Sequence, residues 1–176
     1  FVPRGIGDLY ILVFMHLESR QVIVSPSTRK PNSAWVIEQT QAFVEQTEKR
    51  EHRPTILIHD RDAKFSADFR TTLKDAGIQC KKLPVRSPNL NARVERFIQT
   101  IKNECLDHFI AFGKDHLDYL VREFVHHYNQ ARPHSNRDHR PPCDQSSVPE
   151  WETIRLDEVV CREQLGGVIK SISDSS

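Results

Sequence analysis

Residues 55–62 read TILIHDRD, and residues 87–97 read SPNLNARVERF. The first segment is a short apolar run, rich in β-branched residues, that leads directly into Asp60, and it predicts a buried strand that ends at a carboxylate. The second segment begins with a serine followed by a proline, a pattern typical of a helix N-terminus, and the helix is expected to continue to about Asp107. The chain therefore places one acidic side chain after a strand, Asp60, and another on a helix, Glu95.

The predicted helix separates its apolar side chains from its polar ones. At 100° per residue, the apolar arc expected to be core consists of Val94, Phe97, Ile98, Ile101 and Cys105. The neighbouring polar arc consists of Asn91, Glu95, Gln99 and Lys102. Two carboxylates on rigid elements, with a cation two turns along the helix, are suited to a divalent-metal site for phosphate chemistry. On these features alone, the alternative interpretation is that both are solvated surface carboxylates.

Three segments in order carry a family resemblance: residues 59–65 (HDRDAKF), residues 87–97 and residues 128–134 (YNQARPH). They closely resemble the retroviral-type integrase core of bacterial insertion-sequence transposases, over roughly residues 8–142. The resemblance implies a ribonuclease-H-like fold and a DDE triad of carboxylates. Asp60 matches the second acid of that triad and Glu95 the third, and Lys102 matches a basic position that lies near the DNA terminus in the family.

The first aspartate of the triad belongs on a strand that precedes the one at Leu9, and the sequence is expected to begin after that strand. The expected fold class is α/β: a ribonuclease-H-like mixed sheet flanked by helices, N-terminally truncated, with a small β-rich C-terminal tail. We expect residues 1–142 to form the incomplete catalytic core and residues 143–176 to form a linker and the tail. Short strand candidates in the tail are Ile154–Leu156 and Val159–Cys161.

The rest of the chain alternates strands and helices, as an α/β fold requires. A hairpin is predicted from Leu9–Met15 and Gln21–Ser25, and a strand from Ile78–Leu83. Helices are predicted over Ala34–Lys49 after a cap at Pro31–Ser33, over Phe65–Ala76 ending at Gly77, and over Leu117–Tyr128 ending before Pro133.

Charge is unevenly distributed, although the net charge is only +1. Between residues 81 and 102 six cations stand against one acid, whereas residues 144–176 hold seven acids and three cations. The six cations are Lys81, Lys82, Arg86, Arg93, Arg96 and Lys102. A basic block around acidic metal ligands suits a polyanionic substrate, and the alternative is a solvated helix face.

Other features limit the location and the metal chemistry. No apolar run approaches the roughly 20 residues that a membrane span needs, so no membrane partner is expected and the cytoplasm is the expected location. The four cysteines lack a Cys-x-x-Cys pair, and reduced thiols are expected. The spacing of His126, His127, His134, His139 and Cys143 matches no zinc signature. His59, at a strand end, is interpreted as a partly buried, hydrogen-bonded residue, and the alternative is that it tunes Asp60 or approaches the substrate.

The resemblance implies a polynucleotidyl transferase that joins DNA ends by direct attack on phosphodiesters. Asp60 and Glu95 would be the catalytic metal ligands for two Mg²⁺ or Mn²⁺ ions. Lys102, Asn91, Arg86 and Arg96 would contact the DNA, which comprises the element ends and the target, and a homo-oligomer on DNA is expected. Residues 1–176 alone are expected to be inactive without the first aspartate. The alternatives are an RNase-H-like nuclease and a catalytically inactive DNA-binding remnant.

Overall fold

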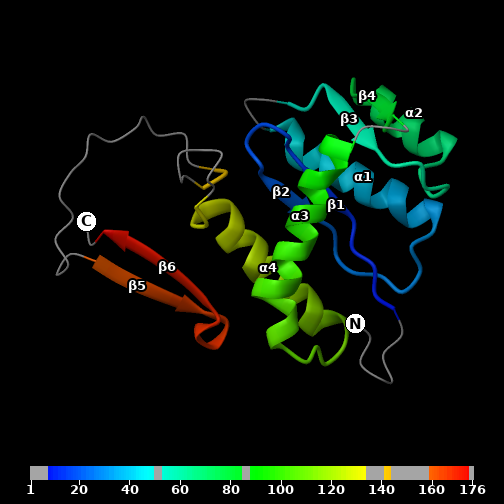
Figure 1. Cartoon of the computed structure of the whole chain (residues 1–176). Helices are drawn as coiled ribbons and strands as arrows, with labels where there is room; N and C mark the ends of the chain where they lie inside the picture. Colours follow the sequence, from blue (N-terminus) through cyan, green and yellow to red (C-terminus); the bar gives the residue numbers. More distant parts are fainter. Residues whose placement is uncertain (1–7, 50–52, 85–87, 134–140, 144–158, 175–176) are drawn as a thin grey trace, which may run out of the picture. The chain divides into compact units, whose positions relative to one another are not determined.

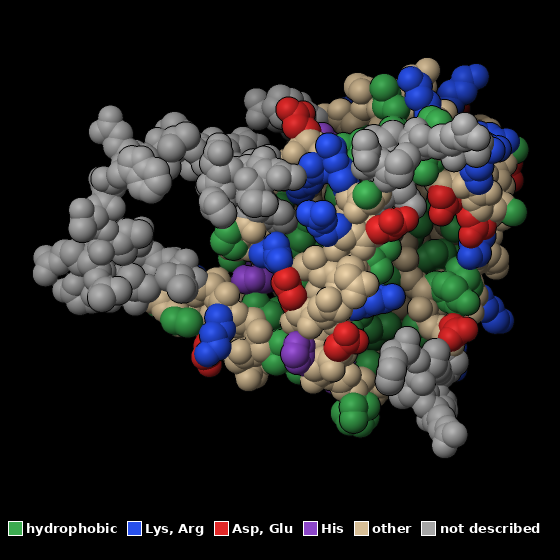
Figure 2. Space-filling view, viewed as in Figure 1, with side chains coloured by type: hydrophobic (Ala, Val, Ile, Leu, Met, Phe, Trp, Pro, Cys, Tyr) green, Lys and Arg blue, Asp and Glu red, His purple; other side chains and the backbone are tan. Residues whose placement is uncertain are grey.

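The computed structural model describes residues 8–49, 53–84, 88–133, 141–143 and 159–174 (Figure 1). The chain forms two compact units, each described here by itself: the first comprises Phe1–Leu12 and Ser25–Arg93, the second Val13–Val24 and Val94–Ser176. Helices and strands occur in both, which confirms the predicted α/β class. Acidic and basic side chains are mixed over the face drawn in Figure 2. In the described ranges, no helix is long and apolar enough to cross a bilayer.

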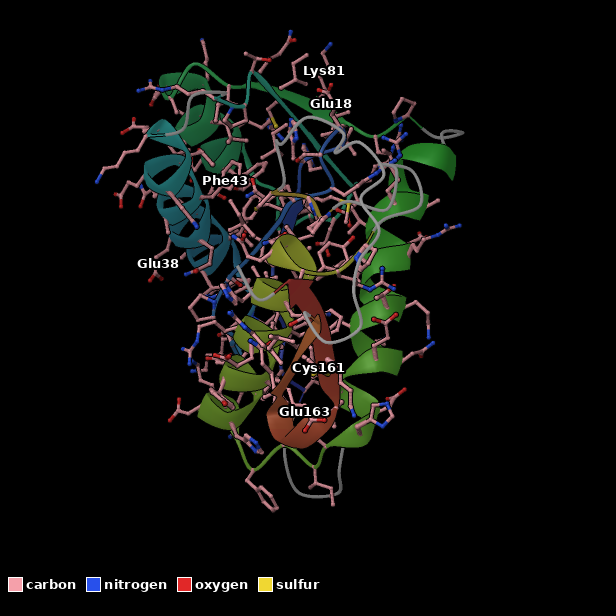
Figure 3. All side chains as sticks on the ribbon, turned by 90° about the vertical axis from the view of Figure 1, so that its left-hand side faces the viewer. Glu18, Glu38, Phe43, Lys81, Cys161 and Glu163 are labelled. Carbon is pink, nitrogen blue, oxygen red and sulfur yellow. The ribbon has the colours of Figure 1, made fainter. Side chains whose placement is uncertain are left out.

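Helix α1 of the first unit spans Ser33–Glu48, which confirms the helix predicted after Pro31–Ser33 and identifies Asn32 as its cap. The Asn32 side chain accepts a hydrogen bond from the Trp35 N–H at 2.9 Å, which satisfies one of the unpaired donors at the helix N-terminus. Phe43 is buried and points inward from α1, whereas Glu38 is exposed and points away (Figure 3).

Strands β3 (Ile56–His59) and β4 (Gln79–Lys82) form a parallel pair in which His59 lies opposite Lys82. Helix α2 (Ala67–Asp75) connects them and packs against α1 and β4. It begins after the Ser66 cap, so Phe65 precedes the helix instead of opening it as predicted. Gly77, at φ +75°, follows the helix in the left-handed conformation that glycine tolerates.

The expectation that β3 is a buried strand is wrong for Ile56, which is 48% exposed. An apolar run is buried on both faces only inside a wide, covered sheet. Among the described residues, β3 pairs with β4 alone. Part of this apolar run therefore remains on the surface.

The second unit contains the predicted hairpin, formed by β1 (Val13–Met15) and β2 (Val22–Val24) in antiparallel register. Its turn closes with Arg20 at φ +66°, where the Arg20 N–H donates to the His16 carbonyl at 2.9 Å. Strand β1 is shorter than the predicted strand over residues 9–15. Before it, the Leu12 N–H bonds the Ser25 hydroxyl at 2.9 Å in place of a strand carbonyl, and this interrupts the ladder.

Helices α3 (Pro88–Glu104) and α4 (Lys114–Gln130) supply the core of the second unit. The Phe97 and Tyr128 rings meet edge to face at 4.9 Å, and Phe124, Ile101 and Cys105 are also buried. Ile98 was expected in this core but is 37% exposed. It lies at the margin of the apolar arc, where a side chain is the first to reach solvent.

The last described element is a hairpin of β5 (Val159–Gln164) and β6 (Ile169–Asp174), joined by the short turn η4 (Leu165–Gly167). Ile169 is buried, and Lys170 pairs with Glu163 at 2.9 Å. Cys161 and Glu163 lie on this hairpin (Figure 3). The strand candidate at residues 154–156 and most of the predicted linker lie outside the described residues.

Candidate functional site

Asp60 lies directly after β3, at the carboxyl end of a parallel strand, and its side chain is exposed. The Asp62 N–H donates to Asp60 Oδ1 at 3.0 Å, and the Lys64 N–H donates to Asp62 Oδ1 at 2.9 Å. The bond from the Lys64 N–H lowers the pKa of Asp62, which also forms an ion pair with the Lys64 ammonium at 3.3 Å. The first of these side-chain turns orients the Asp60 carboxylate at the strand end, where open α/β sheets bind their ligands, and the second orients Asp62.

His59 is buried beside Asp60, with 6% of its surface exposed. Its Nδ1 lies 2.6 Å from the Asp60 carbonyl oxygen, and its ring packs on Phe65 and Phe69 at centroid distances of 4.8 and 5.4 Å. Burial lowers the pKa of His59, and the bond to the Asp60 carbonyl partly opposes this shift. The interpretation of His59 as a buried, hydrogen-bonded residue at a strand end is confirmed.

Cationic side chains surround the same strand ends. Arg61 Nε donates to the Leu83 carbonyl at 3.3 Å, and the Lys64 ammonium lies over the Tyr10 ring at 5.4 Å. Lys81 and Lys82 are exposed on β4 (Figure 3 labels Lys81). The positive charge around an exposed carboxylate favours a polyanionic ligand at this edge of the first unit.

Glu95 and Lys102 belong to the part of α3 in the second unit, and both side chains are exposed, as is Arg96. Gln99 on the same face donates to Asn103 at 2.6 Å. Phe97 and Ile101 lie on the apolar face of the helix and are buried. Asn91 lies on α3 with its side chain outside the described part of the structure, and Arg86 lies outside the described residues.

Asn129 and Arg132, in the motif at residues 128–134, make structural contacts that the sequence pattern did not predict. Asn129 Oδ1 accepts from the Val22 N–H at 2.9 Å, and Asn129 Nδ2 donates to the Val22 carbonyl at 2.8 Å. Arg132 forms two hydrogen bonds with the Glu104 carboxylate, at 2.6 and 3.0 Å, and lies over the Tyr128 ring. The end of α4 therefore fixes both β2 and the end of α3. Both contacts join residues that are far apart in the sequence, so no local pattern could have predicted them.

The donors fit a hard divalent cation. The Asp62 N–H bonds Oδ1 of Asp60, so Oδ2 retains lone pairs for a ligand, and Mg²⁺ prefers carboxylate oxygens. Asp60 and Glu95 fall in different units, and their sharing of one ion remains a prediction. In the described ranges, no three His, Cys, Asp or Glu side chains gather in a metal-binding group.

Comparisons with known proteins agree with the motifs. Residues 76–142 match the family model described as an integrase core domain. The chain is 24% identical, over 82% of its length, to a transposase for insertion sequence element IS904 from Lactococcus lactis subsp. lactis (strain IL1403). It is 33% identical, over 47% of its length, to the insertion element IS600 uncharacterized 31 kDa protein of Shigella sonnei. The predicted resemblance to an integrase core is confirmed.

The fold also has a known counterpart. A chain in the cryo-EM structure of the simian T-cell lymphotropic virus intasome in complex with PP2A regulatory subunit B56 gamma matches 94% of this chain with a TM-score of 0.60 and 13% identity. The present chain spans 64% of that chain, and 57% and 32% of the two relatives.

Proposed function

We propose that the protein to which this chain belongs, with an integrase core of the kind found in insertion-sequence transposases, acts in metal-dependent DNA strand transfer that inserts a mobile element, and that residues 1–176 alone are inactive without the first aspartate. Its partners would be the element ends, the target DNA and further copies of itself, and its location would be the cytoplasm. We also propose that the chain has a ribonuclease-H-like mixed sheet, with residues 1–142 as the catalytic core and residues 143–176 as a linker and β-rich tail.

One observation carries the catalytic part of the proposal: the Asp60 carboxylate is exposed at the carboxyl end of β3, and one oxygen is fixed by the Asp62 N–H at 3.0 Å. A solvent-accessible carboxylate that is already hydrogen-bonded is partly preorganised as a ligand, because its orientation costs less entropy when a cation binds. The Asp62 carboxylate forms an ion pair with Lys64, so we assign Asp60 as the metal ligand in this turn.

In the proposed reaction, Asp60 and Glu95 bind Mg²⁺ or Mn²⁺ through carboxylate oxygens. The bound ions would supply activation of the attacking hydroxyl and stabilisation of the leaving oxygen of a phosphodiester. Lys102 and Arg96, with Asn91 and Arg86, hold the DNA through its phosphates, which fixes the register of the strand without reading its sequence. The reaction requires no covalent enzyme intermediate.

Strand transfer by the protein expressed from its gene tests the proposal, with duplexes from the DNA that flanks the gene as donors and a supercoiled plasmid as target. Asp60→Asn and Glu95→Gln should each reduce joined products to background. Asp68→Asn and Asp115→Asn, which change exposed carboxylates on other helices, should leave joining unchanged.

Three results would contradict the proposal. Joining that survives Asp60→Asn and Glu95→Gln would exclude their role as ligands. Hydrolysis without joining would indicate the RNase-H-like nuclease, and DNA binding without either reaction would indicate the inactive remnant.

A further inference from the structure

We infer that His59 is the positioning residue for Asp60: a buried imidazole that holds the Asp60 main chain so that its carboxylate faces the metal. This inference rests on the proposed function, since it assigns a role toward the ion that Asp60 would bind.

The hydrogen bond between His59 and Asp60 fixes the imidazole tautomer. A carbonyl oxygen can only accept a hydrogen bond, so at 2.6 Å Nδ1 must be the donor. In the neutral ring, the lone pair then lies on Nε2, which is buried and has no hydrogen-bond partner among the described residues. A buried nitrogen without a partner costs free energy. Among the described residues, the bond from Nδ1 to the Asp60 carbonyl is therefore the hydrogen bond that the His59 side chain makes.

The surrounding rings hold the imidazole in place. Phe65, two residues before α2, and Phe69, within α2, both contact the imidazole, and the two phenyl rings lie 4.9 Å apart. Phe69 is completely buried, and α2 packs against α1. The position of the imidazole is thus set by the core of the first unit.

Asp60 is consequently held from two sides. His59 fixes its carbonyl group, and the Asp62 N–H fixes its carboxylate. The His59 side chain connects a packed aromatic cluster to an exposed ligand. Outer groups that orient a metal ligand typically change metal affinity by about 10-fold to 100-fold when removed.

Substitutions at His59 separate this role from that of an ordinary core residue. His59→Phe keeps an aromatic ring in the cluster but removes the donor. His59→Asn keeps a donor, because Asn Nδ2 is bonded to Cγ as His Nδ1 is, but removes most of the ring. A purely structural role predicts that Phe is the better replacement, whereas the positioning role predicts that Asn is.

The test is the Mn²⁺ affinity of the whole protein, measured by calorimetry, together with the Tm of each variant. His59→Phe should weaken Mn²⁺ binding by about tenfold or more while the Tm stays close to that of the wild type. His59→Asn should bind Mn²⁺ more tightly than His59→Phe even if its Tm is lower. Wild-type Mn²⁺ affinity in His59→Phe would overturn the inference.

If His59→Phe does not fold, ¹⁵N NMR of the wild-type imidazole decides. A protonated Nδ1 is expected, and an Nε2–H tautomer would overturn the inference. Asp60→Asn distinguishes a failure of the proposed function from a failure of the positioning role. If Asp60→Asn leaves Mn²⁺ binding unchanged, the proposed function fails. If it removes binding while His59→Phe binds normally, the positioning role alone fails.

Discussion

At the level of single residues, the proposed ligands are exposed, and the side chains that orient them are buried or hydrogen-bonded. Asp60 is oriented by Asp62 and His59, and the end of α3, the helix of Glu95, is fixed by Arg132. A ligand must reach solvent to meet its substrate, whereas a residue that orients it must be immobile. Substitutions at these two kinds of position should therefore change different measurements.

The difference in burial between the cysteines predicts a difference in thiol reactivity. Cys105 is completely buried, and burial raises the pKa of its thiol to about 11, whereas Cys161 is exposed. Because the thiolate is the reactive form, Cys161 should react rapidly with a thiol reagent at pH 8 and Cys105 only on unfolding. Mass spectrometry of the modified peptides checks this, with Cys161→Ser as control. Equal rates at the two cysteines would contradict the burial of Cys105.

The pH dependence of stability should involve His127. Burial lowers the pKa of His127, Arg132 and His126 lower it further, and Glu104 opposes them. Since the pKa is lower in the folded protein, the unfolded state takes up the proton first as the pH falls below about 6.5, and the free energy of unfolding should decrease. Urea unfolding at pH 7.5 and 5.5 should show a smaller decrease for His127→Gln than for the wild type. An unchanged decrease would exclude His127 as a contributor.

At the level of elements, local signals predicted the helices well. The Asn32 cap, the Gly77 stop and the apolar periodicity of α4 act within a few residues, so they can be recognised in the sequence. Strand extent and exposure depend on pairing with distant segments, as at Leu12 and Ile56, and the sequence does not encode those partners locally.

The same distinction applies to the candidate site. Local patterns predicted the elements that carry Asp60 and Glu95, whereas their assignment as metal ligands depends on the family resemblance and stays a prediction. The contacts of Asn129 could not be predicted, because its partner Val22 is 107 residues away.

Asn129 allows a test of this long-range contact. Its side chain makes two hydrogen bonds with the Val22 backbone, which would lose both partners in Asn129→Ala. The free energy of unfolding should fall by about 1–3 kcal/mol in urea titrations. Gln130→Ala, at the exposed neighbouring position, should change it by no more than about 0.5 kcal/mol. Equal effects of the two substitutions would contradict a specific role for Asn129.

At the level of the whole molecule, the proposal requires a nearly neutral protein to bind DNA through local positive charge. If phosphate contacts dominate, the logarithm of DNA affinity should fall steeply and linearly with the logarithm of salt concentration. Lys102→Ala should reduce the slope by about one contact, and Lys74→Ala, at an exposed position of α2, should leave it unchanged. Fluorescence anisotropy at several salt concentrations measures both. A slope near zero would indicate a protein partner instead of DNA.

The central claim is that Asp60 and Glu95 bind the same divalent ion. A double-mutant cycle on Mn²⁺ affinity tests it most directly, using the wild type, Asp60→Asn, Glu95→Gln and the double variant. Two ligands of one ion are coupled, so each single substitution should weaken Mn²⁺ binding and the double variant should lose less than the sum of the two losses. Losses that simply add, or a single substitution without effect, would contradict the shared site.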